Sequence, residues 1–211
     1  MWPMSSVSVE YRWHDAKLNF SHAYLLPPVI DALARFPWTG GPKRVFEVGA
    51  GNGAVAAHLT TLGYEVTGVE PSNDGVTQAH KAFPGLAIEQ ASTDEDLAAR
   101  FGHFPVVLSL EVVEHVYAPR LFAQRVFELL APGGVAIVST PYHGYLKNVA
   151  VALSGKFDQH VNPLWDHGHI KFWSMKTLTA LLREAGFRDV RYVRVGRVPA
   201  LAKSMIAFAT K

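Results

Sequence analysis

The chain has 211 residues, 49% of them hydrophobic, and this length is typical of one domain with extensions. It contains no cysteine, which excludes disulfides, thiolate metal sites, iron–sulfur clusters and a cysteine nucleophile. The 20 basic and 18 acidic residues nearly balance, so charge alone does not predict nucleic-acid binding. No segment has the ~20 apolar residues of a membrane helix, and the N-terminus lacks a signal-peptide pattern. We therefore expect a cytoplasmic protein without a membrane span.

Helical periodicity first appears in residues 15–36 and predicts a helix before the core. Further along, short apolar runs alternate with helical patterns, which is typical of βαβ units and a mainly parallel sheet. The expected strands of this core are 43–48, 65–69, 86–89, 105–110 and 135–139. The expected helices between them are 54–62, 75–83, 94–100 and 119–130.

Residues 142–168 are polar and aromatic without a clear period, and this length predicts a functional or partly helical insert. Ser174 is expected to cap a helix over 174–185. Runs at 190–195 and 204–209, joined by a short connection, predict an antiparallel hairpin. We divide the single domain into an N-terminal helical cap (1–42), a cofactor-binding core (43–141), a substrate-side insert (142–173) and a C-terminal helix and hairpin (174–211).

The segment from Glu47 to Gly53, EVGAGNG, joins the first core strand to the helix that follows. Its glycines permit a tight turn and close approach of a ligand, and the helix offers free N–H groups to an anion. One interpretation is a dinucleotide site, since Gly49, Gly51 and Ala54 fit that fingerprint and an acidic residue follows about 20 residues later. Another interpretation is a structural turn without a ligand. Three glycines and an acid at a strand end argue against it, because they are costly for packing alone.

The same turn resembles motif I, E/D-x-G-x-G-x-G, of class I S-adenosylmethionine-dependent methyltransferases. The tighter spacing and the acid before the first glycine favour this resemblance over the dinucleotide interpretation, because a pyrophosphate gains nothing from a carboxylate. Later segments match in the family's order, so that the resemblance runs from about residue 44 to residue 187. They are VTGVE at 66–70, SLEVVEHV at 109–116, LAPGG at 130–134, STP at 139–141, HIKFWS at 169–174 and LLREAGF at 181–187.

The resemblance implies a Rossmann-like α/β fold with seven strands, six parallel and one antiparallel, and helices on both faces. It implies that Glu70 binds the ribose hydroxyls, which suits a carboxylate because it accepts several hydrogen bonds. It also implies that Ser92 and Thr93 lie beside adenine, although the acid frequent there in relatives is displaced to Asp94. The cofactor-binding residues that it implies are Glu47, Gly49, Ala50, Gly51, Gly53, Glu70, Pro71, Ser92, Thr93, Leu110 and Glu111.

Glu111, Glu114 and His115 fall on one face if a helix or turn begins at the first of them. Two carboxylates and an imidazole can bind a divalent cation such as Mg²⁺ or Mn²⁺. The pattern is similar to the metal ligands of small-RNA 2′-O-methyltransferases and of ubiquinone-biosynthesis O-methyltransferases. In the RNA enzymes a later histidine completes the site, and His169 matches it better than His167. His115 or His169 acting as a metal-free catalytic base, and purely structural roles, are the alternatives.

We therefore expect S-adenosylmethionine-dependent methyl transfer to a small-molecule acceptor, with oxygen as the accepting atom. An NAD(P)-dependent oxidoreductase and a non-catalytic cofactor-binding module are the alternative functions. Nucleic acid is not an expected partner, and neither the acceptor nor the oligomeric state follows from the sequence. The N-terminal aromatic and histidine residues are expected to be packed or to cover the cofactor: Tyr11, Trp13, His14, His22 and Tyr24. The arginines between 183 and 197 are interpreted as a solvated face, with anion binding as the alternative.

Overall fold

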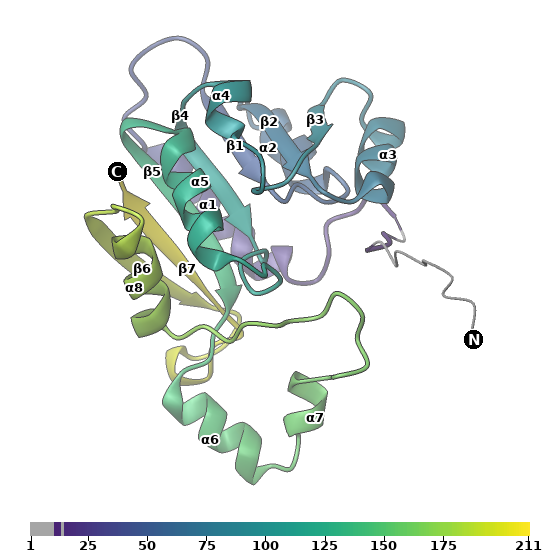
Figure 1. Ribbon diagram of the computed structural model, residues 1–211, viewed down its shortest axis with the longest axis vertical. Coiled ribbons are helices and arrows are strands. Elements are labelled where there is room, and N and C mark those ends of the chain that lie inside the picture. The colour runs from purple at the N-terminus through teal and green to yellow at the C-terminus, as the bar shows by residue number, and fades with distance from the viewer. Residues whose placement is uncertain (1–10, 14) are drawn as a thin grey trace, which may run out of the picture.

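The computed structural model describes residues 11–13 and 15–211, and across that range the strands form one seven-stranded sheet. The strand order is β3-β2-β1-β4-β5-β7-β6 (Figure 1). β7 runs antiparallel to both neighbours, whereas the other six strands share one direction. The predicted fold class is therefore confirmed. The strands are β1 Arg44–Val48, β2 Glu65–Glu70, β3 Ala87–Gln90, β4 Phe104–Leu110, β5 Leu130–Pro141, β6 Asp189–Val195 and β7 Ser204–Thr210.

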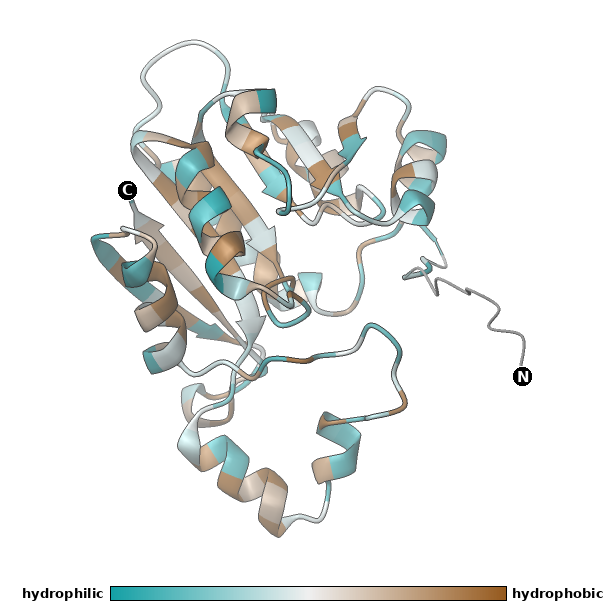
Figure 2. Cartoon of the chain, viewed as in Figure 1, coloured by the Kyte–Doolittle hydropathy of each residue, from teal (hydrophilic) through white to brown (hydrophobic). Residues whose placement is uncertain are grey.

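Helices cover both faces of the sheet and form two hydrophobic clusters with it. α1, α2 and α3 pack on one face, and α4, α5 and α8 pack on the other. Successive strand residues point to opposite faces, so Val106 and Val107 of β4 belong to different clusters. Figure 2 shows the hydrophobic colouring of the central strands between these layers. The helices are α1 His22–Arg35, α2 Ala54–Thr61, α3 Asn73–Ala82, α4 Leu97–Phe101, α5 Pro119–Leu129, α6 Tyr145–Leu153, α7 Phe157–His160, α8 Met175–Glu184 and the 3₁₀ helix η1 Pro199–Leu201.

Side-chain caps set several helix boundaries. Ser174 caps α8, accepting the N–H of Thr177, whose hydroxyl in turn accepts the N–H of Ser174, which confirms the predicted cap. α3 begins two residues earlier than predicted because the hydroxyl of Ser72 accepts the N–H of Gly75. α4 begins three residues later than predicted, because the carboxylate of Asp96 caps its first turn.

Two further boundaries differ from the sequence expectation. α1 begins at His22 rather than near residue 15, because Asn19 accepts the N–H groups of Ser21 and His22 in a local turn. β5 begins before the Pro132-Gly133-Gly134 segment, because Leu130 already pairs with β4. That pairing shifts register around the proline and glycines, so the segment lies within an irregular strand.

The insert between β5 and α8 projects from the body of the molecule and carries α6 and α7 (Figure 1). Neither helix has a buried residue, and the α6 side chains Tyr145 and Leu153 are 81% and 85% exposed. An isolated parallel bridge between Tyr142 and Trp173 closes the base of the insert, and both aromatic side chains are buried. The insert is thus a partly helical excursion anchored at its two ends.

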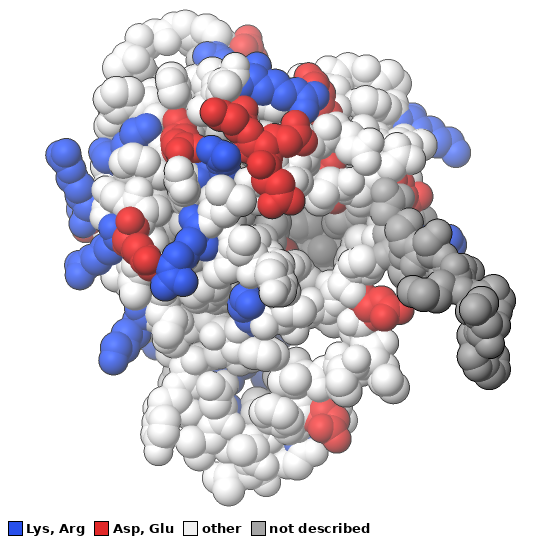
Figure 3. All heavy atoms as spheres, viewed as in Figure 1, with Lys and Arg blue, Asp and Glu red and all other residues white. Residues whose placement is uncertain are grey.

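The charges on the body of the molecule are mixed. The face shown in Figure 3 carries both basic and acidic side chains on the body, and the insert is mostly uncharged. Within the described part of the chain, no helix has the length and apolar character needed to cross a membrane.

Candidate active site

The glycine-rich turn lies at the carboxyl end of β1, where it leads into α2 (Figure 1). Gly49, Gly51 and Gly53 all have positive φ, a conformation that favours glycine. A β-carbon at residue 51 would lie 2.5 Å from the ring of Trp13, so a larger residue does not fit there. A β-carbon at residue 53 would lie 2.9 Å from the side chain of Ala79, which gives that glycine a packing role between α2 and α3.

A cavity of about 640 Å³ opens beside this turn, at the carboxyl ends of β1, β2 and β4. The strand order reverses between β1 and β4, which is where open α/β sheets bind their ligands. The volume lies in the usual range for small-molecule sites, about 300–1,000 Å³. The predicted cofactor residues that line this cavity are Glu47, Gly49, Ala50, Gly51, Glu70, Pro71, Leu110 and Glu111.

Three predicted cofactor residues lie elsewhere. Gly53, Ser92 and Thr93 are absent from the cavity lining that the described residues form. The hydroxyl of Ser92 donates to the carboxylate of Asp94 at 3.2 Å and accepts its N–H at 3.1 Å, closing a local turn. The contact between this loop and adenine therefore stays a prediction.

Glu70 is fixed to the glycine-rich turn by its own carboxylate. One oxygen accepts the N–H of Gly51 at 2.9 Å, and the other accepts the N–H of Ser72 at 3.0 Å. Burial raises the pKa of Glu70, and these two hydrogen bonds oppose the rise. A carboxylate has about four lone-pair positions, so capacity to bind a diol remains.

Glu47 presents a buried and unsatisfied oxygen to the same cavity. The residue is 2% exposed, and its Oε2 atom has no hydrogen-bond partner among the described residues. Burial, and then the neighbouring carboxylate of Glu70, raises the pKa of Glu47 to about 8. Such a group is costly to leave unpaired. The cavity therefore fits a ligand with a cationic amino group, as S-adenosylmethionine has.

The segment before α1 forms part of the cavity wall. Trp13 and Tyr11 line it, and Trp13 donates its backbone N–H to the carboxylate of Asp74 at 2.7 Å. The hydroxyl of Ser72 donates to the Tyr11 carbonyl at 2.8 Å, and the Asn52 amide donates to the carbonyl of residue 15 at 2.7 Å. We call residues 11–13 and 15–17 the strap. His14, which the sequence also singled out, lies outside the described residues.

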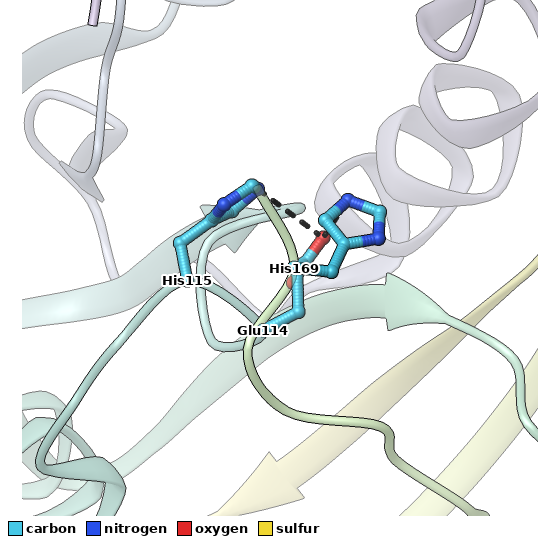
Figure 4. A group of neighbouring side chains, drawn as sticks. All are labelled: Glu114, His115 and His169. Carbon is cyan, nitrogen blue, oxygen red and sulfur yellow. Dashed lines mark ion pairs between the residues drawn. The ribbon is translucent and has the colours of Figure 1, made fainter. Parts of the chain in front are cut away.

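Glu114, His115 and His169 form a cluster beyond the glycine-rich turn (Figure 4). The Glu114 Oε1 atom lies 4.0 Å from His115 Nε2 and 3.9 Å from His169 Nε2. Their candidate ligand atoms all lie within 4.8 Å of one another. Glu114 is 1% exposed, and neither of its carboxylate oxygens has a hydrogen-bond partner among the described residues. The set of donors and the orphaned carboxylate fit a divalent cation.

The protonation states of the cluster favour neutral imidazoles. His115 Nδ1 donates to the His167 carbonyl at 2.8 Å, because a carbonyl only accepts, and this leaves a lone pair on Nε2. Burial lowers the pKa of His115, and burial together with His115 lowers the pKa of His169 to about 4. Burial, and then the charge of Glu111, raises the pKa of Glu114 well above its ordinary value.

Glu111, the fourth residue of the predicted metal set, is engaged elsewhere. Its carboxylate accepts the hydroxyls of Ser139 at 2.8 Å and Ser204 at 3.1 Å. Burial raises the pKa of Glu111 to about 7, and the two hydrogen bonds oppose the rise. The residue has φ 55, and only a short turn follows it. No helical face gathers the motif, and the structure brings His169 to Glu114 and His115 but leaves Glu111 apart.

A family model described as "Methyltransferase domain" matches residues 20–192 of the chain. The chain belongs to this methyltransferase family. Together with the fold, the match shows that the protein is a class I S-adenosylmethionine-dependent methyltransferase.

The chain is also similar to individual known methyltransferases. The methyltransferase is 29% identical over 201 residues to a ubiquinone biosynthesis O-methyltransferase of Burkholderia pseudomallei strain 1710b, covering 92% of this chain and 84% of that one. It is 37% identical over 164 residues to the enzyme of that name from Cereibacter sphaeroides strain KD131, covering 76% and 65%. A methyltransferase structure from Archaeoglobus fulgidus has a TM-score of 0.63 and 17% identity, covering 87% and 93%, and shares the fold.

Several site residues of this methyltransferase were not singled out by sequence reasoning. Asn52 lies in the glycine-rich turn and holds the strap by a hydrogen bond. A polar side chain among glycines was the sequence feature that could have indicated this role. Asp74, in the first turn of α3, looks in sequence like an ordinary helix-start acid. The aromatic side chains between residues 142 and 173, in contrast, were expected either to wall a substrate pocket or to form core. Trp165 lines the cavity, whereas Tyr142 and Trp173 are core residues.

Proposed function

We propose that this methyltransferase transfers a methyl group from S-adenosylmethionine to an oxygen atom of a small molecule. The observation that carries the proposal is one cavity lined both by the glycine-rich turn and by His115 and His169. A cofactor held at the turn and an acceptor held at the cluster would therefore face each other in one cavity. The similarity to two O-methyltransferases supports oxygen as the accepting atom.

The cofactor supplies an activated methyl group on its sulfonium, so the chain must orient the reactants and exclude water. Glu47 would bind the amino end and Glu70 the ribose, on either side of Gly51. The strap would cover the cofactor from solvent, because Trp13 lies over the turn. These assignments leave Glu114, His115 and His169 free to act on the acceptor.

An oxygen acceptor must lose a proton, which a base or a metal ion can assist. The pKa of His169, about 4, makes its imidazole a weak base but a competent neutral metal ligand. We therefore favour a divalent cation, Mn²⁺ or Mg²⁺, held by Glu114, His115 and His169. Such an ion would lower the pKa of an acceptor hydroxyl and orient it toward the methyl group.

The test of the function is methyl transfer to a panel of catechols, phenols, amines and short RNAs, followed as S-adenosylhomocysteine formed. We expect turnover with hydroxyl acceptors of low molecular weight. Transfer to amines or RNA alone would contradict the assignment to oxygen or to small molecules. Cofactor binding with no turnover on any acceptor would favour a non-catalytic module.

The metal is tested by chelation and by Glu114→Gln. We expect chelation to abolish transfer, Mn²⁺ or Mg²⁺ to restore it, and Glu114→Gln to weaken metal binding at least about tenfold. Glu184→Gln is the matched control, because Glu184 is exposed and paired with Arg120. Activity that survives chelation, with normal metal affinity in Glu114→Gln, would leave the cluster with a structural or metal-free role.

A further inference from the structure

A second cavity, of about 340 Å³, lies between the insert and the connection from β6 to β7. Lys147 of α6 and Arg197 of that connection both line this cavity, although they are far apart in the sequence. The second cavity adjoins the first, because Trp165 and His169 line both. We call the second space the basic cavity.

The cations of the basic cavity form no ion pair within the part of the chain that the structure describes. Among the described residues, neither Lys147 nor Arg197 takes part in an ion pair. The Lys147 ammonium donates one hydrogen bond, to the Lys203 carbonyl at 3.2 Å. Lys203 also lines the basic cavity, and its ammonium lies 4.2 Å from the ring centre of Phe20. Two cations that share a cavity repel each other until an anion enters.

Lys147 is also unusually placed for a charged side chain. It is half-buried, and burial followed by the charge of Arg197 lowers its pKa to about 8. Among the described residues, Glu111 is the only carboxylate that appreciably counteracts this lowering of the Lys147 pKa. Glu111 lines the first cavity, and its oxygens already accept two serine hydroxyls. A partly desolvated lysine without a paired carboxylate is therefore suited to a ligand that brings its own negative charge.

We propose that the basic cavity binds an anionic group of the methyl acceptor, a carboxylate or a phosphate, through Lys147 and Arg197. This inference rests on the proposed function and names the substrate class within it. An acceptor whose reacting oxygen lies beside His169 would extend past Trp165 into the basic cavity, since both residues are shared walls. Arg197 would bind the anion with its planar donor pairs, and Lys147 would act as a point charge.

Binding measurements without turnover test the inference. The ligands are 3,4-dihydroxybenzoate, 3,4-dihydroxyphenyl phosphate and the neutral 3,4-dihydroxybenzamide, added to protein saturated with S-adenosylhomocysteine. We expect whichever of the two anionic ligands binds more tightly to have a dissociation constant at least about tenfold lower than that of the amide, and this ratio is the measure of anion selectivity. The preference between the carboxylate and the phosphate identifies the anionic group that the cavity binds. Lys147→Gln and Arg197→Gln should each bring this ratio close to one. Lys176→Gln, an exposed charge change on α8 outside the basic cavity, should leave it unchanged.

A ratio near one in the wild type, or an unchanged ratio in both cavity variants, would overturn the inference. If no ligand binds measurably, acetylation of Lys147 followed by mass spectrometry decides the matter. Inorganic phosphate or benzoate should slow acetylation of Lys147 and leave Lys176 unaffected, and the absence of protection would overturn the inference. Methyl transfer without anion selectivity contradicts this inference alone, whereas anion selectivity without methyl transfer contradicts the proposed function alone.

Discussion

At the residue scale, two buried carboxyl groups stand out because each presents an unpartnered oxygen at the active site. Glu47 does so beside the glycine-rich turn, and Glu114 does so between two imidazoles. A buried unpaired carboxylate is destabilising in the free protein. Both groups are therefore explained best by ligands that neutralise them, the amino end of the cofactor at Glu47 and a cation at Glu114.

Glu47 should make the ligand-free protein less stable as pH rises. Its pKa is raised from 4.5 to about 8, so between these values the unfolded chain ionises this carboxyl and the folded protein does not. The penalty is absent below pH 4.5 and complete above pH 8. Urea unfolding should show Glu47→Gln to be more stable than the wild type at pH 8, by on the order of 4 kcal/mol, and equal to it at pH 4.

The exposed Glu65→Gln variant is the control for this comparison and should follow the wild type at both pH values. A Glu47→Gln effect on stability that does not change with pH would contradict the assigned protonation. The same variant should bind S-adenosylhomocysteine more weakly, because it lacks the carboxylate that pairs with the amino group.

At the element scale, the caps and the strap position the site. α8 begins at a reciprocal cap, and its buried residues Leu178, Leu181 and Leu182 hold it on the sheet next to α5. The backbone just before it is fixed as well, since the N–H groups of Ile170 and Lys171 both donate to the Glu114 carbonyl. These contacts bring His169 to the cluster from far along the chain.

The cap of α8 is a stability element with no chemical role. Ser174→Ala removes the acceptor for the Thr177 N–H, and we expect it to lower the free energy of unfolding by about 1 kcal/mol. Ser154→Ala, at the exposed end of α6, should change that free energy by less than about 0.5 kcal/mol. Denaturant titration measures both, and equal effects of the two variants would contradict the capping role.

The strap should control how fast the cofactor leaves. Trp13 lies against Gly51 and lines the cavity, so Trp13→Ala should open the site and speed release of S-adenosylhomocysteine about tenfold. Trp13→Phe keeps an aromatic ring there and should release it at nearly the wild-type rate. Stopped-flow fluorescence measures the release, and identical rates in all three proteins would show that the strap does not cover the ligand.

At the scale of the whole molecule, the larger cavity lies where β1, β2 and β4 meet both hydrophobic clusters. A ligand that binds only this folded arrangement must stabilise the entire domain. S-adenosylhomocysteine at about 100 times its dissociation constant should raise the free energy of unfolding by about 2.7 kcal/mol. NADH at the same concentration should have no effect, and stabilisation by NADH alone would contradict the assigned cofactor.

Local sequence patterns predicted helices, strands and turns well where residues close together in sequence decide the structure. The glycine turn, the alternation of strands and helices, the cap at Ser174 and the antiparallel hairpin all follow from residues close together in sequence. Boundaries shifted where a neighbouring side chain intervened, as Ser72 does at α3 and Asp96 at α4. These shifts are small because caps act within one turn of helix.

The sequence by itself determined the fold class, the glycine-rich turn and the identities of Glu114, His115 and His169 as a candidate set. Only the tertiary structure decided which members meet, because Glu111 turns toward Ser139 and Ser204 and the contact between positions 114 and 169 depends on the path of the insert. It likewise decided that Arg197 shares a cavity with Lys147, where the sequence left a solvated face and anion binding as alternatives. Periodicity and spacing report contacts within an element, whereas contacts between distant segments are set by packing of the whole sheet and its helices.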